Sequence, residues 1–400
     1  MRFMNGSHPP PFAKGETIVN LAAMIGARFG QNSPMAILTS QALTNAIMGS
    51  KNIVLLLLDG LGDAQISRLV HDGSLARARV AKLDSVFPSS TAPAVTSLAS
   101  GLTPASHLIT GWHMWSPEHH EVIRPLPLDC RSRPGSVDPQ EIFNWRPLAA
   151  TLGPAMSALQ PAAIAKSAFS AYAFGSHGPR AYVRLSDLRT KIVETVATSP
   201  TGGRYVYAYL PQFDSAAHEH GCESSEAASV ARSFDSFYGQ IADDLGTSDT
   251  LVMAIADHGF IDIPPAAHLR IEDYPEIARH LAHPITGEPR VAFCHVKPRG
   301  MRDFANAVQA QLGFAFDCVE SETLIEGGWF GPRALVRDGL GARLGHYTLI
   351  ARDRYCLTQT LAGESPASFK GMHGGVHRDE RIVSVSASLG GQPLSTPAVH

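Results

Sequence analysis

Acidic and imidazole side chains stand at positions in the sequence from which they could bind metal ions. Asp59 directly follows an apolar run, Asp214 and His218 are four residues apart, and Asp257 directly precedes His258. An aspartate and a histidine at this spacing face the same way on a helix, and carboxylate and neutral imidazole are ligands that zinc accepts. Because such pairs are also common on solvent-exposed helix faces, the pair alone is a weak signal. An acid after a strand is a stronger one, since open α/β sheets bind ligands at the carboxyl ends of their strands.

A hydroxyl-rich turn, residues 87–91 with the sequence Phe-Pro-Ser-Ser-Thr, adds a candidate nucleophile. The turn precedes a helical start that contains Pro93, and Gly101 is a suitable stop for that helix. The hydroxyl of Thr91 would then face the free N–H groups and the positive end of the helix dipole, where an anionic phosphate binds well. Taken alone, the same residues are better explained as a simple N-cap.

Three apolar runs position the acids. Residues 52–58, 205–210 and 250–255 are rich in aliphatic and aromatic residues, and each run leads to an aspartate. Continuous apolar runs of this length are typical of strands buried on both faces of a parallel sheet. Between the second and third runs, apolar residues recur every three or four positions behind Ser224, which predicts a helix. Strand, helix and strand in this order predict an α/β fold with a parallel sheet that collects the three acids at one edge.

A late His-Gly-Gly sequence that starts at His373 supplies a further imidazole. Together these separate segments provide enough nitrogen and oxygen ligands for two divalent cations. Copper or nickel would compete in affinity, but the ligand types fit zinc best, with manganese as the alternative. The predicted metal ligands are Asp59, Thr91, Asp214, His218, Asp257, His258 and His373.

The composition excludes several other classes of protein. The chain of 400 residues has 33 Lys and Arg against 36 Asp and Glu, a formal charge of −3, which argues against a nucleic-acid polymer as partner. Its five cysteines are an odd number without a Cys-x-x-Cys pair, which disfavours a disulfide scaffold and a thiolate zinc site. The longest aliphatic run, residues 53–58, is far shorter than the roughly 20 residues of a membrane helix. The first residues also lack the pattern of a signal peptide, so we expect a cytoplasmic protein that binds no membrane.

Prolines and changes of pattern divide the chain into segments. We predict a core domain over residues 1–262, an inserted cap subdomain over residues 263–365, and a return to the core over residues 366–400 that carries the last metal ligand. Within the predicted cap, strand-like and helix-like segments alternate, which indicates a small α/β unit. Residues 339–345 contain three glycines without the spacing of a dinucleotide-binding motif and predict a loop.

Residues 117–148, rich in proline and charge, predict a long surface excursion near the site. Just before it, Trp112 is a candidate to line a substrate pocket by stacking on a ring, although a place in a packed core explains it equally well. Arg124, Arg131 and Arg133 are candidates to contact a phosphate, although charged side chains more often face solvent.

In their order along the chain, the motifs resemble those of the nucleotide pyrophosphatase/phosphodiesterase branch of the alkaline phosphatase superfamily. The resemblance rests on a strand-end acid, Phe-Pro-x-x-Thr, Asp-x-x-x-His, Asp-His-Gly and a late His-Gly, found here at Asp59, residues 87–91, Asp214 with His218, residues 257–259 and residues 373–374. It implies an alkaline-phosphatase-like three-layer α/β sandwich with a mostly parallel central sheet and an inserted smaller α/β cap. It also implies that one metal is held by Asp59, Thr91, Asp257 and His258, and a second by Asp214, His218 and His373.

Two departures from the family pattern bear on the substrate. Phosphodiesterases of the family usually carry Phe-Pro-Asn directly after the nucleophile, and the asparagine amide helps to hold a phosphoryl oxygen. Here Ala92 follows Thr91, and this amide is missing. The backbone N–H groups from Ser90 to Ala92 are candidates to replace part of that amide. The late motif also departs from the pattern, because the family has an aromatic residue and an aspartate after His-Gly, whereas residues 373–378 read His-Gly-Gly-Val-His-Arg. This leaves His377 as a rival ligand to His373.

We therefore expect a two-metal hydrolase of phosphodiester or phosphoanhydride bonds, acting through a phospho-Thr91 intermediate on a small phosphate ester such as a nucleotide. Metal coordination would lower the pKa of the threonine hydroxyl, which is otherwise a poor nucleophile. A phosphonoacetate hydrolase, which also uses threonine and a late His-Gly-Gly, is the nearest alternative, and a phosphomonoesterase is another. A sulfatase is disfavoured because the turn lacks its Cys or Ser nucleophile and its Arg. A non-catalytic binding protein on the same scaffold is a further alternative.

Overall fold

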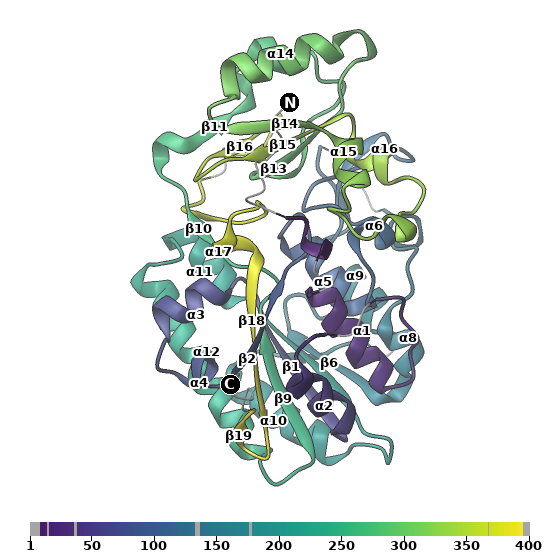
Figure 1. The fold of residues 1–400 in the computed structure, drawn as a ribbon, viewed down its shortest axis with the longest axis vertical. Coiled ribbons are helices and arrows are strands. Elements are labelled where there is room, and N and C mark those ends of the chain that lie inside the picture. The colour runs from purple at the N-terminus through teal and green to yellow at the C-terminus, as the bar shows by residue number, and fades with distance from the viewer. Residues whose placement is uncertain are drawn as a thin grey trace.

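The central element is an eight-stranded sheet, which lies in the lower half of Figure 1. The computed structural model describes residues 9–13, 16–35, 38–132, 137–175, 178–366 and 368–394. The strand order is β19-β18-β9-β1-β8-β6-β7, with β2 paired to β18. Pairs among β9, β1, β8, β6 and β7 are parallel, whereas β18 is antiparallel to β9, β2 and β19. The bounds are Asn52–Leu58 (β1), Arg79–Asp84 (β2), Met156–Pro161 (β6), Arg180–Tyr182 (β7), Tyr205–Leu210 (β8), Thr250–Ile255 (β9), Ile382–Leu389 (β18) and Gln392–Pro393 (β19).

Strand β1 shows why both faces of this sheet are covered. Every residue of the strand is buried. Successive side chains of a strand point to opposite faces. Ile53 and Leu55 accordingly pack into one hydrophobic cluster, while Val54 and Leu56 pack into another. The expected three-layer α/β sandwich with a mostly parallel sheet is thus confirmed.

Helices form the two outer layers, one on each side of the sheet in Figure 1. Helix α5 holds the predicted nucleophile and α11 holds two predicted ligands, so the two layers meet at the site from opposite sides. One layer contains α1 (Ile18–Arg28), α2 (Gln41–Gly49), α5 (Thr91–Ser100), α8 (Leu148–Leu152) and α9 (Ala168–Phe174). The other contains α3 (Asp63–Leu69), α4 (Ser74–Arg77), α10 (Leu185–Ala197), α11 (Gln212–His220) and α12 (Ser225–Asp244).

A second, four-stranded antiparallel sheet lies within the predicted insert, in the upper part of Figure 1. Its order is β12-β13-β15-β14, with bounds Thr286–Glu288, Val291–Cys294, Tyr347–Ala351 and Phe316–Glu320. Helix α14 (Met301–Leu312) covers one face of this sheet, while α15 (Ser321–Glu326) and α16 (Leu340–Leu344) cover the other. The two ends of the insert lie side by side, because β10 (Ile261–Asp262) pairs antiparallel with β17 (Gly371–Met372). The boundaries at residues 263 and 365 stay a prediction.

Helix α16 corrects the predicted loop at residues 339–345. Leu340 and Leu344 are four residues apart and buried in the same hydrophobic cluster, and Gly339 begins the helix in a left-handed conformation with φ of +95°. Burial of the two leucines therefore overrides the low helix propensity of the glycines.

Short elements complete the chain. Strands β3, β4 and β5 form a small antiparallel sheet within and just before the predicted excursion, and β11 pairs with β16 in the insert. Their bounds are Met114–Ser116 (β3), Glu121–Arg124 (β4), Asp129–Cys130 (β5), His268–Arg270 (β11) and Cys356–Thr358 (β16). The short helices are α6 (Pro104–His107), α7 (Pro139–Ile142), α13 (Pro275–Ala278) and α17 (Arg378–Arg381).

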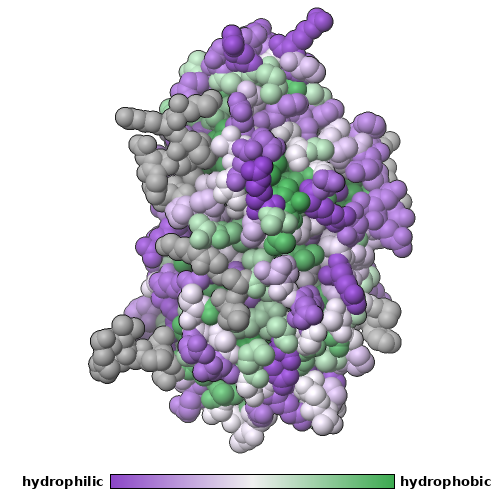
Figure 2. All heavy atoms as spheres, turned by 45° about the vertical axis from the view of Figure 1, so that its right-hand side comes forward, coloured by the Kyte–Doolittle hydropathy of each residue, from purple (hydrophilic) through white to green (hydrophobic). Residues whose placement is uncertain are grey.

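One face of the molecule has both hydrophobic and hydrophilic surface. On the face shown in Figure 2, hydrophobic residues gather in small groups near the centre, whereas the top and the right-hand edge are mainly hydrophilic. Within the described ranges, the structure has no helix with the length and apolar character needed to cross a membrane.

A buried ion pair fastens the insert to the core. Arg290, which follows β12, donates from Nε and Nη2 to the two carboxylate oxygens of Glu380 in α17, each at 2.8 Å. The Arg290 side chain is 1% exposed and that of Glu380 is fully buried. Glu380 also accepts the N–H of Gly375 at 2.8 Å, so the pair links the insert to the late His-Gly-Gly segment.

Replacing Arg290 should destabilise the protein strongly, because Glu380 would be left as a buried charge without its partner. We expect Arg290→Met to lower the free energy of unfolding by about 3–5 kcal/mol in denaturant titrations. The matched control is Arg352→Met, which removes a pair with Asp317 in the same insert whose arginine is 44% exposed. That change should cost at most about 1 kcal/mol. Equal effects of the two variants would contradict the role given to the buried pair.

Candidate active site

The carboxyl ends of three neighbouring strands bring the three predicted acids together. Strand β1 lies between β8 and β9, with Leu58 opposite Leu210 and Leu57 opposite Ile255, so the three strands end at nearly the same level. Asp59 directly follows β1, Asp257 lies two residues after β9, and Asp214 is in the first turn of α11 after β8. This is the edge at which the sequence places the site.

The first group of side chains surrounds His258. Its Nε2 lies 3.4 Å from Oδ1 of Asp59, 3.6 Å from Oδ2 of Asp257 and 3.1 Å from Oγ1 of Thr91. All four residues are buried, and Thr91 is the most exposed of them at 9%. The four residues that the resemblance assigns to one metal therefore converge on a single point.

The second group adjoins the first on its more open side. Oδ1 of Asp214 lies 3.4 Å from Nε2 of His218 and 3.7 Å from Nε2 of His373, and the two Nε2 atoms are 3.2 Å apart. The side chains of Asp214 and His218 are about 20% exposed. The ring of His373 stacks on that of His258 with centroids 3.8 Å apart, so the two groups share a wall. All seven predicted metal ligands thus lie together.

The late histidine is held by pairing on both sides. Met372, just before it, pairs with Ile261 in the β10–β17 ladder, and Gly374, just after it, bridges to Ser89 of the nucleophile turn. His377 has a different role, because it forms the N-cap of α17 and its Nδ1 accepts the N–H of Asp379 at 3.1 Å. Of the two rivals in the late motif, the structure places His373 in the cluster.

Three carboxylate oxygens in the cluster have no hydrogen-bond donor among the described residues. They are Oδ1 of Asp59, Oδ1 of Asp214 and Oδ2 of Asp257, the same atoms that lie nearest the histidine Nε2 atoms. Buried polar atoms without partners are rare in native proteins and call for an explanation such as an ion. The two sets with suitable geometry are Asp59, Asp257 and His258, and Asp214, His258 and His373. Oxygen and imidazole nitrogen donors fit divalent zinc or manganese.

The other atoms of these ligands bind to the protein and fix their orientation. The hydroxyl of Tyr209 donates to Oδ2 of Asp59, and the N–H of Gly60 donates to Oδ1 of Asp257 at 3.1 Å. Nδ1 of His218 lies 2.9 Å from the carbonyl of Gly371, which places the ring proton on Nδ1 and leaves Nε2 as an acceptor. Such outer partners are typical of metal ligands. Gly60 also needs its φ of +78°, and a Cβ there would lie 2.5 Å from the Phe260 ring.

The electrostatics of the cluster favour cations. Burial, and then the charges of Asp257 and Asp214, raise the pKa of Asp59 well above its usual range. Burial, and then the charge of Asp257, likewise raise the pKa of Asp214. Burial lowers the pKa of His218 to about 4, so its imidazole is neutral at pH 7 and its lone pair is available. A bound dication reverses the effect on the acids, because its charge stabilises the carboxylate form.

Helix α5 presents Thr91 as its first residue, with Ser90 as N-cap and Gly101 in the left-handed conformation at its end. The first hydrogen bond of the helix runs from the N–H of Ala94 to the carbonyl of Ser90 at 3.1 Å. Because Pro93 has no N–H group, the free donors of the first turn are those of Thr91 and Ala92. Ser90, also predicted to bind substrate, has its N–H on the carbonyl of Pro88, so it offers no free backbone donor.

Glu288 is a member of the site that the sequence reasoning missed. It comes from β12 of the insert, is 6% exposed, and its Oε1 accepts both the hydroxyl of Ser90 and the N–H of Trp112. It packs so closely on Gly374 that a Cβ there would lie 2.8 Å from it. Burial raises the pKa of Glu288 to about 7. No local pattern marks this glutamate, which lies 198 residues from Ser90 in the chain.

A cavity of about 660 Å³ opens beside Thr91, Asp59 and Asp214. Trp112 lines it and is 38% exposed, and its stacking on a substrate ring stays a prediction. Other residues of the lining are Val95, Arg124, Leu126, Pro127, Asp129, Gln160, Ala163, Ile164, Ser167, Phe169, Ser170, Tyr207 and Tyr209. Part of the predicted excursion thus reaches the site.

The arginines of that excursion are engaged by acids. Arg124 donates from Nε and Nη2 to both carboxylate oxygens of Asp129, at 2.7 and 2.6 Å. Arg131 binds Glu364 in the same two-pronged way, at 2.8 Å for both contacts. Arg133 lies outside the described residues. Neither described arginine is therefore a free phosphate ligand.

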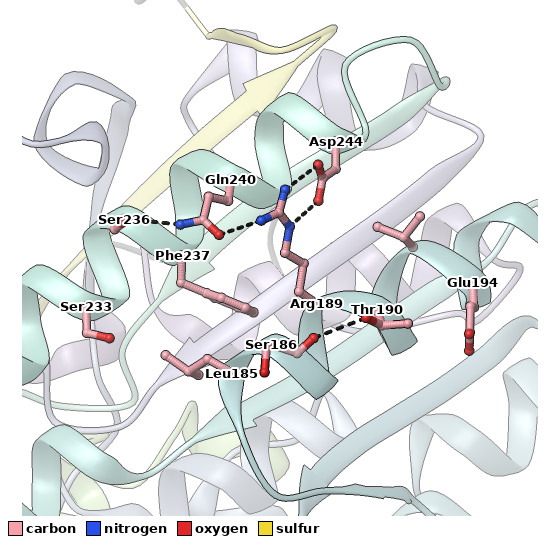
Figure 3. A pocket seen from close by; sticks show the side chains of 11 residues that line it. Leu185, Ser186, Arg189, Thr190, Glu194, Ser233, Ser236, Phe237, Gln240 and Asp244 are labelled. Carbon is pink, nitrogen blue, oxygen red and sulfur yellow. Dashed lines mark hydrogen bonds and ion pairs between the residues drawn. The ribbon is translucent and has the colours of Figure 1, made fainter.

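A different cavity of about 810 Å³ lies between α10 and α12 and contains none of the predicted site residues. Figure 3 shows Arg189 reaching across it to Gln240 and Asp244, and Nε of Arg189 is 2.5 Å from a carboxylate oxygen of Asp244. Arg189 pairs with Asp244, and Glu194 of the lining pairs with Arg180, so we place the chemistry at the strand ends instead.

Comparison with known proteins agrees with this site. A family model described as type I phosphodiesterase/nucleotide pyrophosphatase matches residues 53–376. Murine ectonucleotide pyrophosphatase/phosphodiesterase 5 has a similar structure, with a TM-score of 0.65 and 17% identity over 84% of this chain and 88% of the other. An inactive threonine-to-alanine variant of that murine protein in complex with AMP matches with a TM-score of 0.65 and 16% identity, over 85% and 88%. The human protein matches with a TM-score of 0.62 and 16% identity, over 84% and 87%.

A search of curated protein sequences found no significant match. The structural likeness nevertheless confirms the expected alkaline-phosphatase-like fold. The family model extends from β1, before the first acid, to just beyond His373, and so contains every predicted metal ligand. The chain therefore belongs to the type I phosphodiesterase/nucleotide pyrophosphatase family.

Proposed function

We propose that the protein is a two-metal hydrolase that cleaves phosphodiester or phosphoanhydride bonds of small substrates through a phospho-Thr91 intermediate. The observation that carries the proposal is the place of the Thr91 hydroxyl. It lies at the start of α5 and 3.1 Å from Nε2 of His258, beside the carboxylate oxygens of Asp59 and Asp257 that lack donors. A hydroxyl among free metal-binding atoms is the arrangement that activates such a nucleophile.

The residues present fit two divalent cations, of which zinc is our first choice and manganese the second. Asp59, Thr91, Asp257 and His258 would hold one ion, and Asp214, His218 and His373 the other. When bound, the ions would neutralise the carboxylates, lower the pKa of the hydroxyl and stabilise charge on the phosphoryl group.

The chain itself supplies the nucleophile and part of the anion site. Thr91 loses its proton to solvent, its Oγ1 forms a bond to phosphorus, and the bond to the leaving oxygen breaks, with water protonating that oxygen. A second water then attacks the phosphorus, the bond to Thr91 breaks, and the hydroxyl regains a proton. The N–H groups of Thr91 and Ala92, at the positive end of α5, would donate to a phosphoryl oxygen in both steps.

Nucleotides are the substrate class that we favour. A structural neighbour binds AMP, and the cavity beside Thr91 has room for the organic part of such a substrate. Phosphonoacetate has less support, because its carboxylate needs a cation and Arg124, the only arginine or lysine of the described cavity lining, is occupied by Asp129. A cytoplasmic location stays a prediction from the sequence.

Thr91→Ala should abolish turnover while leaving the metals bound, because three other ligands of the first ion remain. We expect the rate with bis(p-nitrophenyl) phosphate to fall at least about 1,000-fold. Acid-quenched wild-type protein should carry phosphate on the peptide that contains Thr91. The control is Thr96→Ala in the same helix, whose hydroxyl binds the carbonyl of Ala92 at 2.8 Å and faces no ligand. Full activity of a metal-loaded Thr91→Ala protein would show that the nucleophile is another group.

His218→Ala should lower the metal content from two ions per chain to one, because it removes a ligand of the more exposed group. The control is His220→Ala on the same helix, since His220 lies near Glu219 and outside the cluster. Elemental analysis after dialysis would measure both variants, and a chelator should remove the activity of the wild type. Two ions retained by His218→Ala, or activity that survives full chelation, would refute this assignment.

Glu288→Ala should reduce kcat, because Ser90 would lose the acceptor that holds the start of α5. A misplaced nucleophile costs up to about 100-fold in rate. Glu288→Gln keeps an oxygen that can accept from both Ser90 and Trp112, so we expect it to retain most of the activity. Steady-state kinetics of both variants at matched metal content measure the difference. Equal losses in the two variants would mean that the carboxylate charge, rather than its position as an acceptor, is what matters.

A further inference from the structure

The cavity beside Thr91 has a polar far end that no step of the proposed reaction uses. Gln160, at the end of β6, lines the cavity and is 3% exposed. In the sheet order β1-β8-β6, Gln160 lies two strands away from β1, the strand that leads to Asp59. At the usual spacing between strands this is a distance of about 10 Å. It is therefore too far away to contact the phosphorus and lies where the remainder of a substrate would extend.

Two serines set the orientation of the Gln160 amide. One is Ser170 in α9, and the other is Ser167, the N-cap of that helix. The hydroxyl of Ser170 donates to Oε1 of Gln160 at 2.6 Å. The hydroxyl of Ser167 donates to Oγ of Ser170 at 3.0 Å and itself accepts the N–H of Ser170 at 3.1 Å. With the hydroxyl protons directed in this way, the amide oxygen of Gln160 is the acceptor. Its Nε2 group is left as a donor, and no described residue accepts from it.

The rest of the lining is suited to a flat, uncharged group. Tyr207 and Tyr209 lie two residues apart on β8 and so share a face, and Trp112 and Phe169 also line the cavity. Aromatic side chains of this kind favour planar rings. The charge of Arg124 is neutralised by Asp129, so a second anionic group of a substrate would find no free cation in the described lining.

We propose that Gln160 is a specificity-determining residue, whose Nε2 donates a hydrogen bond to an acceptor on a neutral planar ring of the substrate, such as a carbonyl oxygen or ring nitrogen of a nucleobase. The proposal rests on the proposed function, since it names what the same site recognises beyond the phosphoryl group. Ser170 acts through Gln160 and is a positioning residue. The site then discriminates between rings with and without an acceptor, because a ring without one leaves a buried donor unpaired.

The test compares two esters that share a p-nitrophenolate leaving group. One is the p-nitrophenyl ester of thymidine 5′-phosphate, whose base carries acceptors, and the other is p-nitrophenyl phenyl phosphate, whose ring carries none. Gln160→Met should lower kcat/KM for the thymidine ester roughly 10-fold and leave that for the phenyl ester unchanged. The metal content and the melting temperature of the variant should match those of the wild type.

A selectivity ratio that does not change, or an equal loss on both esters, would overturn the proposal, since Gln160 would then be only a packing residue. Because Gln160 is buried, Ser170→Ala serves as a second variant that keeps the glutamine. The Ser170→Ala change leaves the amide of Gln160 free to turn, so it should lower kcat/KM for the thymidine ester alone. The absence of such a selective loss would also contradict the proposal. Failure of the wild type to cleave either ester would instead refute the proposed function, so the two failures are distinguishable.

Discussion

Three carboxylates crowded at one edge of a parallel sheet are the constraint on which the site depends. Asp59, Asp214 and Asp257 are brought together by strands that end at the same level, and no lysine or arginine of the described chain pairs with them. Removing like charges from water in one place is costly unless a positive charge compensates. The protein binds one oxygen of Asp59 and one of Asp257 through Tyr209 and Gly60, and leaves the others free. The cluster is thus shaped for cations rather than for internal ion pairs.

The segment that the sequence predicts as an insert also contributes contacts to this centre. Glu288 reaches the N-cap of the nucleophile helix and the wall of the cavity, while Arg290, two residues later, is locked to Glu380 behind the late histidine. The hairpin of β12 and β13 is therefore linked to the nucleophile turn through Glu288 and, through Arg290 and Glu380, to Gly375 in the late His-Gly-Gly segment. Phe87 of the nucleophile turn packs in the same cluster as Phe293 of β13, which adds apolar contact to these polar links.

The sequence predicts the sheet, and it also predicts the seven side chains that the structure brings together, because both depend on short local patterns. Strands β1, β8 and β9 are continuous apolar runs with an acid soon after each, and Asp214 and His218 lie on one turn of α11 as their spacing predicts. The sequence did not indicate Glu288 or Gln160, because their proposed roles depend on contacts with residues distant in the chain or with a neighbouring helix. The prediction of a loop at residues 339–345 was wrong because burial of two leucines in the tertiary structure stabilises a helix there. The glycines around them have low helix propensity and indicated a loop. Features that depend on short local patterns could thus be predicted from the sequence, whereas features that depend on long-range packing could not.

The position of the insert also affects how the chain must fold. The β10–β17 pair closes the loop that contains the whole second sheet, and His373 follows directly after that closure. Asp59, at the other end of the family match, is available early, but the last imidazole reaches it only when this long loop has closed. Closing long loops is entropically unfavourable and slows folding relative to local contacts. The full set of proposed metal ligands can therefore assemble only when β10 and β17 have paired and this long loop has closed.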